Sequence, residues 1–203
     1  MNDTIHQITY NGDIVAGSLL VRESRIIAGM LLDDGCEADW HRAVVIENVL
    51  QKKSPVTAKR QMRLIKNRLL LMKPALWKLV AAGSSDVAAQ ALLAASIKYS
   101  RLIGDFMDTV LRTHWQTFNP KITTKDWHDF LETCAQLDPK VGAWTDSTKM
   151  KLKQIVFRIL TESGYVENTR SCRLIPAAVF PEIKNYLVEN SETYILRCME
   201  ITQ

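Results

Sequence analysis

The residues in this sequence that are best suited to chemistry are cations gathered in one stretch without acidic residues. Glu47 and Asp86 are consecutive acidic residues, and nine basic residues lie between them: Lys52, Lys53, Lys59, Arg60, Arg63, Lys66, Arg68, Lys73 and Lys78. The chain has 26 basic and 22 acidic residues and a net charge of +4, so removing these nine leaves 17 basic against 22 acidic residues. Charge concentrated in this way favours an anionic partner such as nucleic acid, with a solvated basic face as the alternative interpretation.

Two helices joined by a polar turn are expected to position these cations. Residues 38–50 place apolar side chains near helical spacing, and Ser54 followed by Pro55 is typical of a helix start. Serine caps free backbone N–H groups, and proline suits the first helical position because the N–H that it lacks has no partner there. The core-facing side of the helix from Pro55 is expected to contain Ala58, Met62, Ile65, Leu69 and Met72. The cations of this helix then face outward.

The helix pair over about residues 38–72 fits a helix-turn-helix that binds double-stranded DNA. In such a motif the second helix enters the major groove, which is roughly 12 Å wide, with the side chains of its N-terminal turns at base edges. Lysines in the turn reach backbone phosphates, which adds affinity without sequence information. The expected DNA-binding residues here are Lys52, Lys53, Thr57, Lys59, Arg60, Arg63, Lys66 and Asn67.

A second candidate DNA-binding region lies near the C-terminus. A helix expected over residues 145–163 precedes two short apolar segments within residues 165–175, which form either a small β-hairpin wing or an irregular loop. The pattern resembles the end of a winged helix, whose turn can place a cation in the minor groove or on a phosphate. The expected DNA-binding residues are Lys149, Lys151, Lys153, Arg170 and Arg173, and the alternative is a core helix followed by an ordinary exposed loop.

The chain as a whole predicts a mostly α-helical, compact multi-helix globular protein. A first helix is expected to be capped by Asn11 or Asp13 and to end at Gly35, because the residues between carry a helical apolar series. Two organisations fit the sequence. In one, residues 1–140 form a helical region with the helix-turn-helix, and residues 141–203 form a winged-helix-like region. In the other, the whole chain is a single compact domain.

Sequence motifs for catalysis, metal binding and cofactor binding are absent. The four histidines lack HExxH or paired-ligand spacing, and the sequence has no Walker A, GxGxxG or GxSxG motif. The four cysteines lie far apart without a CxxC pair, which favours buried, reduced thiols over a zinc site or a disulfide framework. We therefore expect a non-enzymatic protein with no catalytic residues, no metal and no cofactor.

The sequence also predicts where the protein resides. No stretch approaches the roughly 20 apolar residues that a membrane-spanning helix needs. The N-terminal residues MNDTIHQITYNGD have neither the basic region nor the apolar region of a secretory signal. We therefore expect a soluble, cytoplasmic protein without a membrane partner.

Four segments together give the chain a resemblance to a known family over nearly its full length. They are GSLLVRESRIIAGMLLDDG, IENVLQKKSPVTAKRQMRLIKNRL, AAQALLAASIKYSRLIGDF and ILTESGYVE. In their order they are similar to the BrxA family of the bacteriophage exclusion (BREX) phage-defence systems. This resemblance implies a small helical protein that accompanies a DNA methyltransferase and other defence components and binds duplex DNA through helix-turn-helix elements.

Two other functions stay open on the sequence alone. The basic face could dock an acidic surface of another BREX protein, which would make the chain a protein–protein interaction module. The BrxA family has also been compared with NusB-like RNA-binding antitermination factors, so RNA is an alternative partner. The recognition-helix geometry fits the major groove of B-form DNA better than the deep, narrow major groove of RNA.

Overall fold

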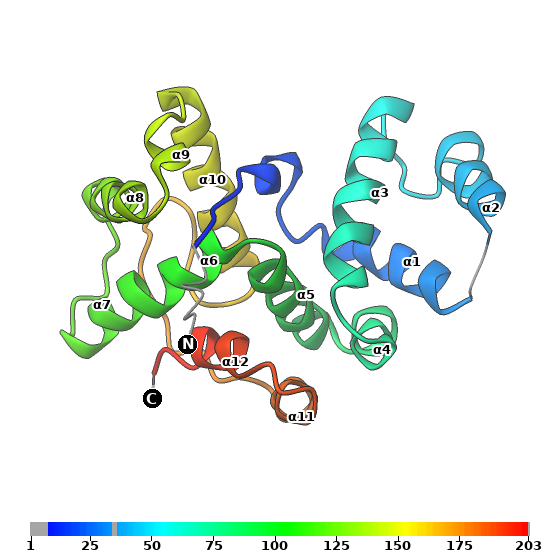
Figure 1. Cartoon of the computed structure of the whole chain (residues 1–203). Helices are drawn as coiled ribbons and strands as arrows, with labels where there is room; N and C mark the ends of the chain where they lie inside the picture. The colour runs from blue at the N-terminus through cyan, green and yellow to red at the C-terminus, as the bar shows by residue number, and fades with distance from the viewer. Residues whose placement is uncertain (1–7, 34–35, 203) are drawn as a thin grey trace, which may run out of the picture.

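The computed structural model describes residues 8–33 and 36–202, which form an almost entirely helical structure (Figure 1). After the short 3-10 turn η1 (Asp13–Ala16), the chain forms a first group of helices, which lies on the right of Figure 1. This group consists of α1 (Val21–Leu32), α2 (Glu37–His41), the π-helical turn η2 (Arg42–Ile46) that continues α2, α3 (Pro55–Leu70) and α4 (Pro74–Ala82).

The remaining helices follow α5 (Ser85–Tyr99), which lies between the first group and the rest of the chain in Figure 1. They are α6 (Arg101–Asp105), the π-helical turn η3 (Phe106–Leu111), α7 (Arg112–Gln116), α8 (Thr124–Leu137), α9 (Pro139–Gly142), α10 (Asp146–Glu162), α11 (Pro181–Glu189) and α12 (Thr193–Met199). The first three of these form one uninterrupted helical run. The predicted mostly α-helical class is therefore confirmed.

Helix α5 is the centre of the fold. Every residue from Val87 to Ile97 is buried, and alanine makes up much of this stretch, so neighbouring helices approach it closely on several sides. Of the polar side chains in this stretch, Gln90 pairs through both ends of its amide: its amide N–H donates to the carbonyl of Ala178 (2.8 Å) and its amide oxygen accepts from the N–H of Phe180 (2.9 Å). The buried amide thereby holds the segment before α11 against α5.

An aromatic cluster fixes α8 and α10 relative to η3. The ring centroid of Phe106 on η3 lies 5.3 Å from Trp127 and 5.1 Å from Phe130, both on α8, and 5.8 Å from Phe157 on α10. The two α8 contacts are edge-to-face, an arrangement that aromatic pairs prefer. Any surface made by α8 and α10 is consequently built on a rigid base.

The first helix differs from its sequence prediction. The expected helix from Asp13 to Gly35 is divided into η1 and α1, and Leu20, just before α1, has a left-handed backbone (φ 52°). The interruption has a tertiary cause, because side chains of α3 and α10 bind the backbone between the two elements. The expected end of the helix, Gly35, lies outside the described residues, and α1 ends at Leu32.

The helix predicted over residues 38–50 ends earlier, at Ile46, after the π-helical turn η2. Asn48 and Gln51 follow with positive φ angles of 50° and 51°, which a continuing helix does not allow. The Asn48 side chain both donates to the carbonyl of Lys52 (3.0 Å) and accepts from the Lys52 N–H (2.9 Å). Asparagine commonly stabilises turns in this way, so the connection to α3 is longer than predicted.

Candidate nucleic-acid interface

Helix α3 begins at the predicted residue. The Ser54 hydroxyl oxygen accepts a hydrogen bond from the Thr57 N–H (3.4 Å), and Pro55 occupies the first helical position. Its buried residues are Ala58, Leu64, Ile65, Arg68 and Leu69. Its exposed residues are Pro55, Val56, Lys59, Arg60, Arg63, Asn67 and Leu70, and Thr57 at the first turn is half-buried. Helical periodicity thus gives α3 the two faces expected from the sequence.

Within residues 8–33 and 36–202, the outward cations of α3 have no counter-ion. Lys59, Arg60 and Arg63, together with Lys53 in the preceding turn, form no ion pair or side-chain hydrogen bond with any other residue that the structure describes. The stretch from Asn48 to Ser85 contains no carboxylate that could reach them along the helix. Their positive field is therefore not neutralised locally.

Lys52 has a different environment from the one predicted. The sequence places it in an exposed turn, free to contact a phosphate, but its ammonium group pairs with the Glu23 carboxylate on α1. Both side chains are largely buried, with 19% and 12% exposure. Because Glu23 precedes Lys52 by 29 residues, local sequence does not reveal this partner. Lys52 is therefore not a free cation in the structure and its contact with a phosphate stays a prediction, whereas Lys53 remains at the surface.

Two more cations of the basic stretch are engaged within the fold. The Lys66 ammonium lies 4.4 Å from the ring centroid of Trp40, a cation–π contact that leaves Lys66 half-buried. Arg68 is only 2% exposed, and its guanidinium donates to the carbonyls of Ser18 (2.6 Å) and Gly17 (3.0 Å). Burial lowers the pKa of Arg68 to about 10. These two residues support the fold more than they add to the outward charge of α3.

The segment after α10 is a backbone-paired hairpin. Val166 pairs with Leu174 in an antiparallel bridge, with hydrogen bonds from Glu167 N–H to the Arg173 carbonyl (2.9 Å) and from Ile175 N–H to the Tyr165 carbonyl (3.1 Å). The turn is ordered by Asn168, whose side-chain oxygen accepts from the N–H groups of Arg170 and Ser171. Of the two alternatives left by the sequence, the structure therefore shows a short hairpin and not an irregular loop.

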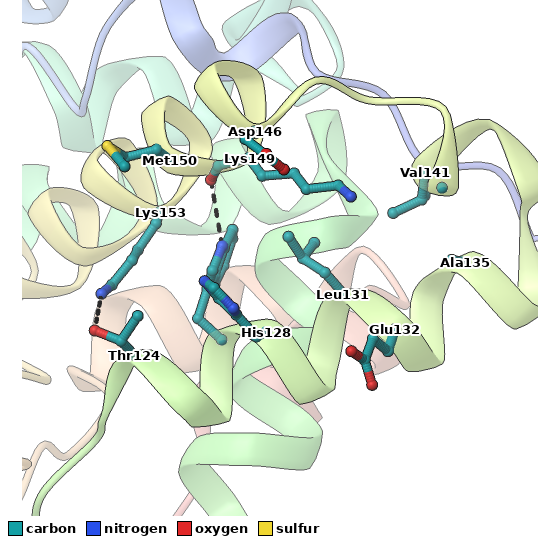
Figure 2. Close-up of a pocket in the computed structure, with 12 residues that line it drawn as sticks. Thr124, His128, Leu131, Glu132, Ala135, Val141, Asp146, Lys149, Met150 and Lys153 are labelled. Atoms are coloured by element: carbon teal, nitrogen blue, oxygen red, sulfur yellow. Dashed lines mark hydrogen bonds between the residues drawn. The ribbon is translucent and has the colours of Figure 1, made fainter.

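The predicted lysines of α10 do not share one surface. Lys149 and Lys153 line a groove of about 400 Å³ between α8, α9 and α10, with Trp127 in its wall (Figure 2). The Lys153 ammonium donates across this groove to the Thr124 hydroxyl (2.6 Å), and the Trp127 N–H donates to the Lys149 carbonyl (3.3 Å). Lys151 lies on the other side of the helix and is exposed. Only Lys151 among the three projects freely to the outside.

The outward face of α10 contains residues that the sequence reasoning missed. Alongside Lys151 it consists of Ser147, Met150, Gln154 and Arg158, all exposed. Arg158 pairs with Glu162 (3.0 Å), so its charge is partly neutralised. Spacings of three and four residues place them on one side of a helix, and this was visible in the sequence as the side opposite the apolar residues. The pattern of lysines alone does not indicate Ser147 and Gln154.

The two basic helices run in a similar direction. In Figure 1, α3 and α10 both run from the top of the view downward, so that their N-terminal ends lie on the same side of the molecule. Arg170 and Arg173 of the hairpin are exposed as predicted, and neither side chain pairs with another described residue. The unpaired cations of the interface are thus contributed by three separate elements.

Two further kinds of site have no candidate among the residues that the structure describes. No group of three or more His, Cys, Asp or Glu side chains is arranged to hold a metal ion there. Over the same residues, no helix combines the length and apolar character required to span a membrane.

These features define an all-α protein in which helices on either side of a buried, alanine-rich helix display basic outward surfaces. The chain belongs to the BrxA family, because the family model described as BrxA matches residues 8–191. The match covers both α3 and α10 with its hairpin.

Individual relatives agree with this assignment. A protein named BREX protein BrxA from Paramagnetospirillum magneticum (strain ATCC 700264 / AMB-1) is 47% identical over 95% of this chain and 97% of its own length. A protein of the same name from Escherichia coli O9:H4 (strain HS) is 32% identical over 93% of this chain and 89% of its own. The fold is similar to the crystal structure of an uncharacterized protein from Magnetospirillum magneticum, with a TM-score of 0.88 and 45% identity over 95% of this chain and 98% of that one.

Proposed function

We propose that this protein binds double-stranded DNA through the outward face of α3 and acts as a non-enzymatic accessory protein of a BREX phage-defence system. The observation that carries the proposal is the set of exposed, unpaired cations Lys59, Arg60 and Arg63 on one helix face. Cations without internal counter-ions gain most from a polyanion, because binding releases the counter-ions condensed on the phosphates. The acid-free sequence around them also removes repulsion between protein carboxylates and DNA.

Helix α3 has suitable geometry for the major groove. It is held from behind by Ile65 and Leu69, while its first turns carry Lys59 and Arg60 outward. A helix fits the major groove with its N-terminal residues at base edges and nearby lysines on phosphates. In this arrangement Lys53, in the turn before α3, contacts the DNA backbone.

The C-terminal region serves as a second DNA contact in this proposal. From α7 to Ile175 the order is helix, short pairing segment, α8, the four-residue helix α9, α10 and hairpin, which is the order of a winged helix with one additional short helix. The outward face of α10 then turns Lys151 and Gln154 toward the DNA, and Arg170 extends from the hairpin turn. Glutamine can form two hydrogen bonds with adenine in the major groove, so Gln154 is the residue of this face best suited to read sequence.

The defence role rests on the relatives. Proteins that cover nearly the whole chain bear the name BREX protein BrxA, and the family model extends over both proposed contact regions. We therefore place this chain in the same kind of system, with other BREX proteins as its protein partners. The proposed location is the cytoplasm, where such a protein meets DNA.

The experiment that tests this function is a competition titration of labelled duplex DNA against RNA at several salt concentrations. We expect duplex DNA to be preferred at matched salt, and the logarithm of the binding constant to fall linearly with the logarithm of the salt concentration. Preference for structured or single-stranded RNA would replace the proposal by RNA-binding antitermination. Absence of nucleic-acid binding, with co-purification of a BREX protein that survives nuclease treatment, would replace it by the interaction module.

A further inference from the structure

The C-terminal region places two cations directly opposite each other across an isolated β-bridge. Lys121, just before α8, forms an antiparallel bridge with Arg173 of the hairpin. The flanking hydrogen bonds run from Ile122 N–H to the Cys172 carbonyl (3.0 Å) and from Leu174 N–H to the Pro120 carbonyl (2.7 Å). These two hydrogen bonds lie on either side of Lys121 and Arg173, and no backbone hydrogen bond joins the two residues directly. In this class of antiparallel pair the two Cα atoms are only about 4.5 Å apart and the side chains are close.

Both side chains project away from the core. Leu174, the residue after Arg173, is 3% exposed, and its bridge partner Val166 is 1% exposed, so these two face inward. Successive side chains of a strand point to opposite faces, and Lys121 and Arg173 are accordingly exposed on the outer face. The two cations therefore share one patch of surface.

No carboxylate neutralises this pair within the described residues. Neither Lys121 nor Arg173 forms an ion pair or a side-chain hydrogen bond there. Glu167 lies opposite Arg173 on the other arm of the hairpin, but the two side chains form no ion pair, and the Glu167 carboxylate accepts a hydrogen bond from the Ser171 hydroxyl (2.9 Å). Like charges directly opposite each other destabilise a β-pair, so the folded chain keeps an unfavourable contact that an external anion would relieve.

We propose that Lys121 and Arg173 form a clamp for a backbone phosphate of nucleic acid. This inference deepens the proposed function and rests on it for the identity of the polyanion. Arginine presents a planar fork of N–H donors to phosphate oxygens, and lysine adds a compact charge. Arg173 lies on the hairpin whose turn carries Arg170, and Lys121 lies just before α8. A phosphate bound between the two residues would fix the hairpin on the DNA backbone without reading sequence.

The clamp predicts two effects of opposite sign for the double variant Lys121→Gln/Arg173→Gln. Without DNA at low salt, the variant should melt about 1–3 °C higher than the wild type, because the repulsion is removed. With DNA, it should bind duplex roughly 10-fold or more weakly at about 0.1 M salt, with a salt slope that is shallower by roughly 0.9, the value for one lost phosphate contact. A residue pair with a merely structural role would not combine higher stability with weaker binding.

The matched control is Arg22→Gln/Lys78→Gln, which removes two exposed, unpaired cations from α1 and α4. This control should reproduce neither the rise in melting midpoint nor the change in salt slope. The proposal is overturned if Lys121→Gln/Arg173→Gln melts no higher than the control, or if it binds duplex with the wild-type affinity and slope.

Inorganic phosphate separates failure of the clamp from failure of the proposed function. If the wild type does not bind duplex, DNA binding is wrong, and the clamp is judged by phosphate alone. A phosphate-dependent rise in melting midpoint that is larger for the wild type than for Lys121→Gln/Arg173→Gln supports an anion site at this pair. Equal rises in the two proteins overturn it.

Discussion

Arg68 on α3 and Glu162 on α10 bind the same backbone link, residues 17–20, from two sides. The Arg68 guanidinium donates to the carbonyl of Ser18 (2.6 Å), and the Glu162 carboxylate accepts from the Leu19 N–H (2.9 Å) and from the Ser18 hydroxyl (2.8 Å). The link joins η1 to α1, so the helices that carry the two basic surfaces are connected through one short segment. This contact also explains why the first predicted helix is interrupted.

Replacement of Glu162 by Gln should weaken this connection. The amide can still reach Ser18 and Leu19, but it is neutral, so the variant loses the charge-assisted character of both hydrogen bonds and the ion pair with Arg158. We expect Glu162→Gln to lower the free energy of unfolding by about 1–2 kcal/mol, measured by urea denaturation. Glu132→Gln, on the exposed face of α8 and without an ion pair to other described residues, is the control. Equal stability of the two variants would contradict the role of Glu162.

Charge reversal on α3 should separate binding from folding. The triple variant Lys59→Glu/Arg60→Glu/Arg63→Glu removes three exposed, unpaired cations, so we expect duplex affinity to fall. The salt slope should decrease by roughly 0.9 for each phosphate that the variant no longer neutralises. Anisotropy titrations at several salt concentrations measure both quantities. Circular dichroism should show a folded protein, because these side chains support no internal ion pair. Wild-type affinity in a folded triple variant would rule out α3 as the DNA-binding surface.

The inward face of α3 should show the reverse behaviour. Leu69 is fully buried, whereas the adjacent Leu70 is 51% exposed. Leu69→Ala should lower the free energy of unfolding by about 2–4 kcal/mol, since it leaves a cavity in the core. Leu70→Ala, the matched control, should change it by less than about 0.5 kcal/mol. Similar decreases for the two variants in urea denaturation would show that the faces of α3 are assigned incorrectly.

Gln154 offers a test of sequence reading by α10. Selection of preferred sites from randomised duplexes should show an altered preference at one or two base pairs for Gln154→Ala, with little change in affinity for unrelated DNA. Gln136→Ala, which truncates an exposed glutamine on α8, should retain the wild-type preference. Identical preferences for the wild type and Gln154→Ala would mean that α10 does not read bases through this residue.

The cysteines should differ in reactivity according to burial. Burial raises the pKa of the Cys134 thiol to about 11 and that of Cys198 to about 12, so both stay protonated at neutral and mildly alkaline pH. Cys36 is exposed, contrary to the expectation of buried thiols throughout. Iodoacetamide at about pH 8 should therefore modify Cys36 well before Cys134 and Cys198, as followed by mass spectrometry. Labelling in urea, where all thiols are accessible, is the control, and early modification of Cys134 in the folded protein would contradict the packing.

Much of the interface could be predicted from local sequence. Ser54 and Pro55 mark the start of α3, and the spacing of Ala58, Ile65 and Leu69 places its core-facing side. These features depend on helix capping and on 3.6-residue periodicity, which act over a few residues of chain. The outward position of Lys59, Arg60 and Arg63 follows from the same periodicity.

Whether an individual cation is free or paired depended on residues far away in the chain. Lys52 pairs with Glu23, Arg68 binds the link before α1, and Lys153 reaches Thr124 on α8. Each of these contacts joins residues at least 29 positions apart. Amino-acid composition counts all three residues as free positive charges, because it does not show which groups contact each side chain in the folded protein.

By itself, the sequence determined that the chain is helical, that α3 has a basic outward face, and that a basic helix precedes two short apolar segments, which it left as either a hairpin or a loop. Only the tertiary structure decided which of these cations remain free and which are brought together, as Lys121 and Arg173 are from distant parts of the chain. The physical reason is that helix formation and amphipathicity arise from neighbouring residues, whereas ion pairing and burial arise where separate elements pack.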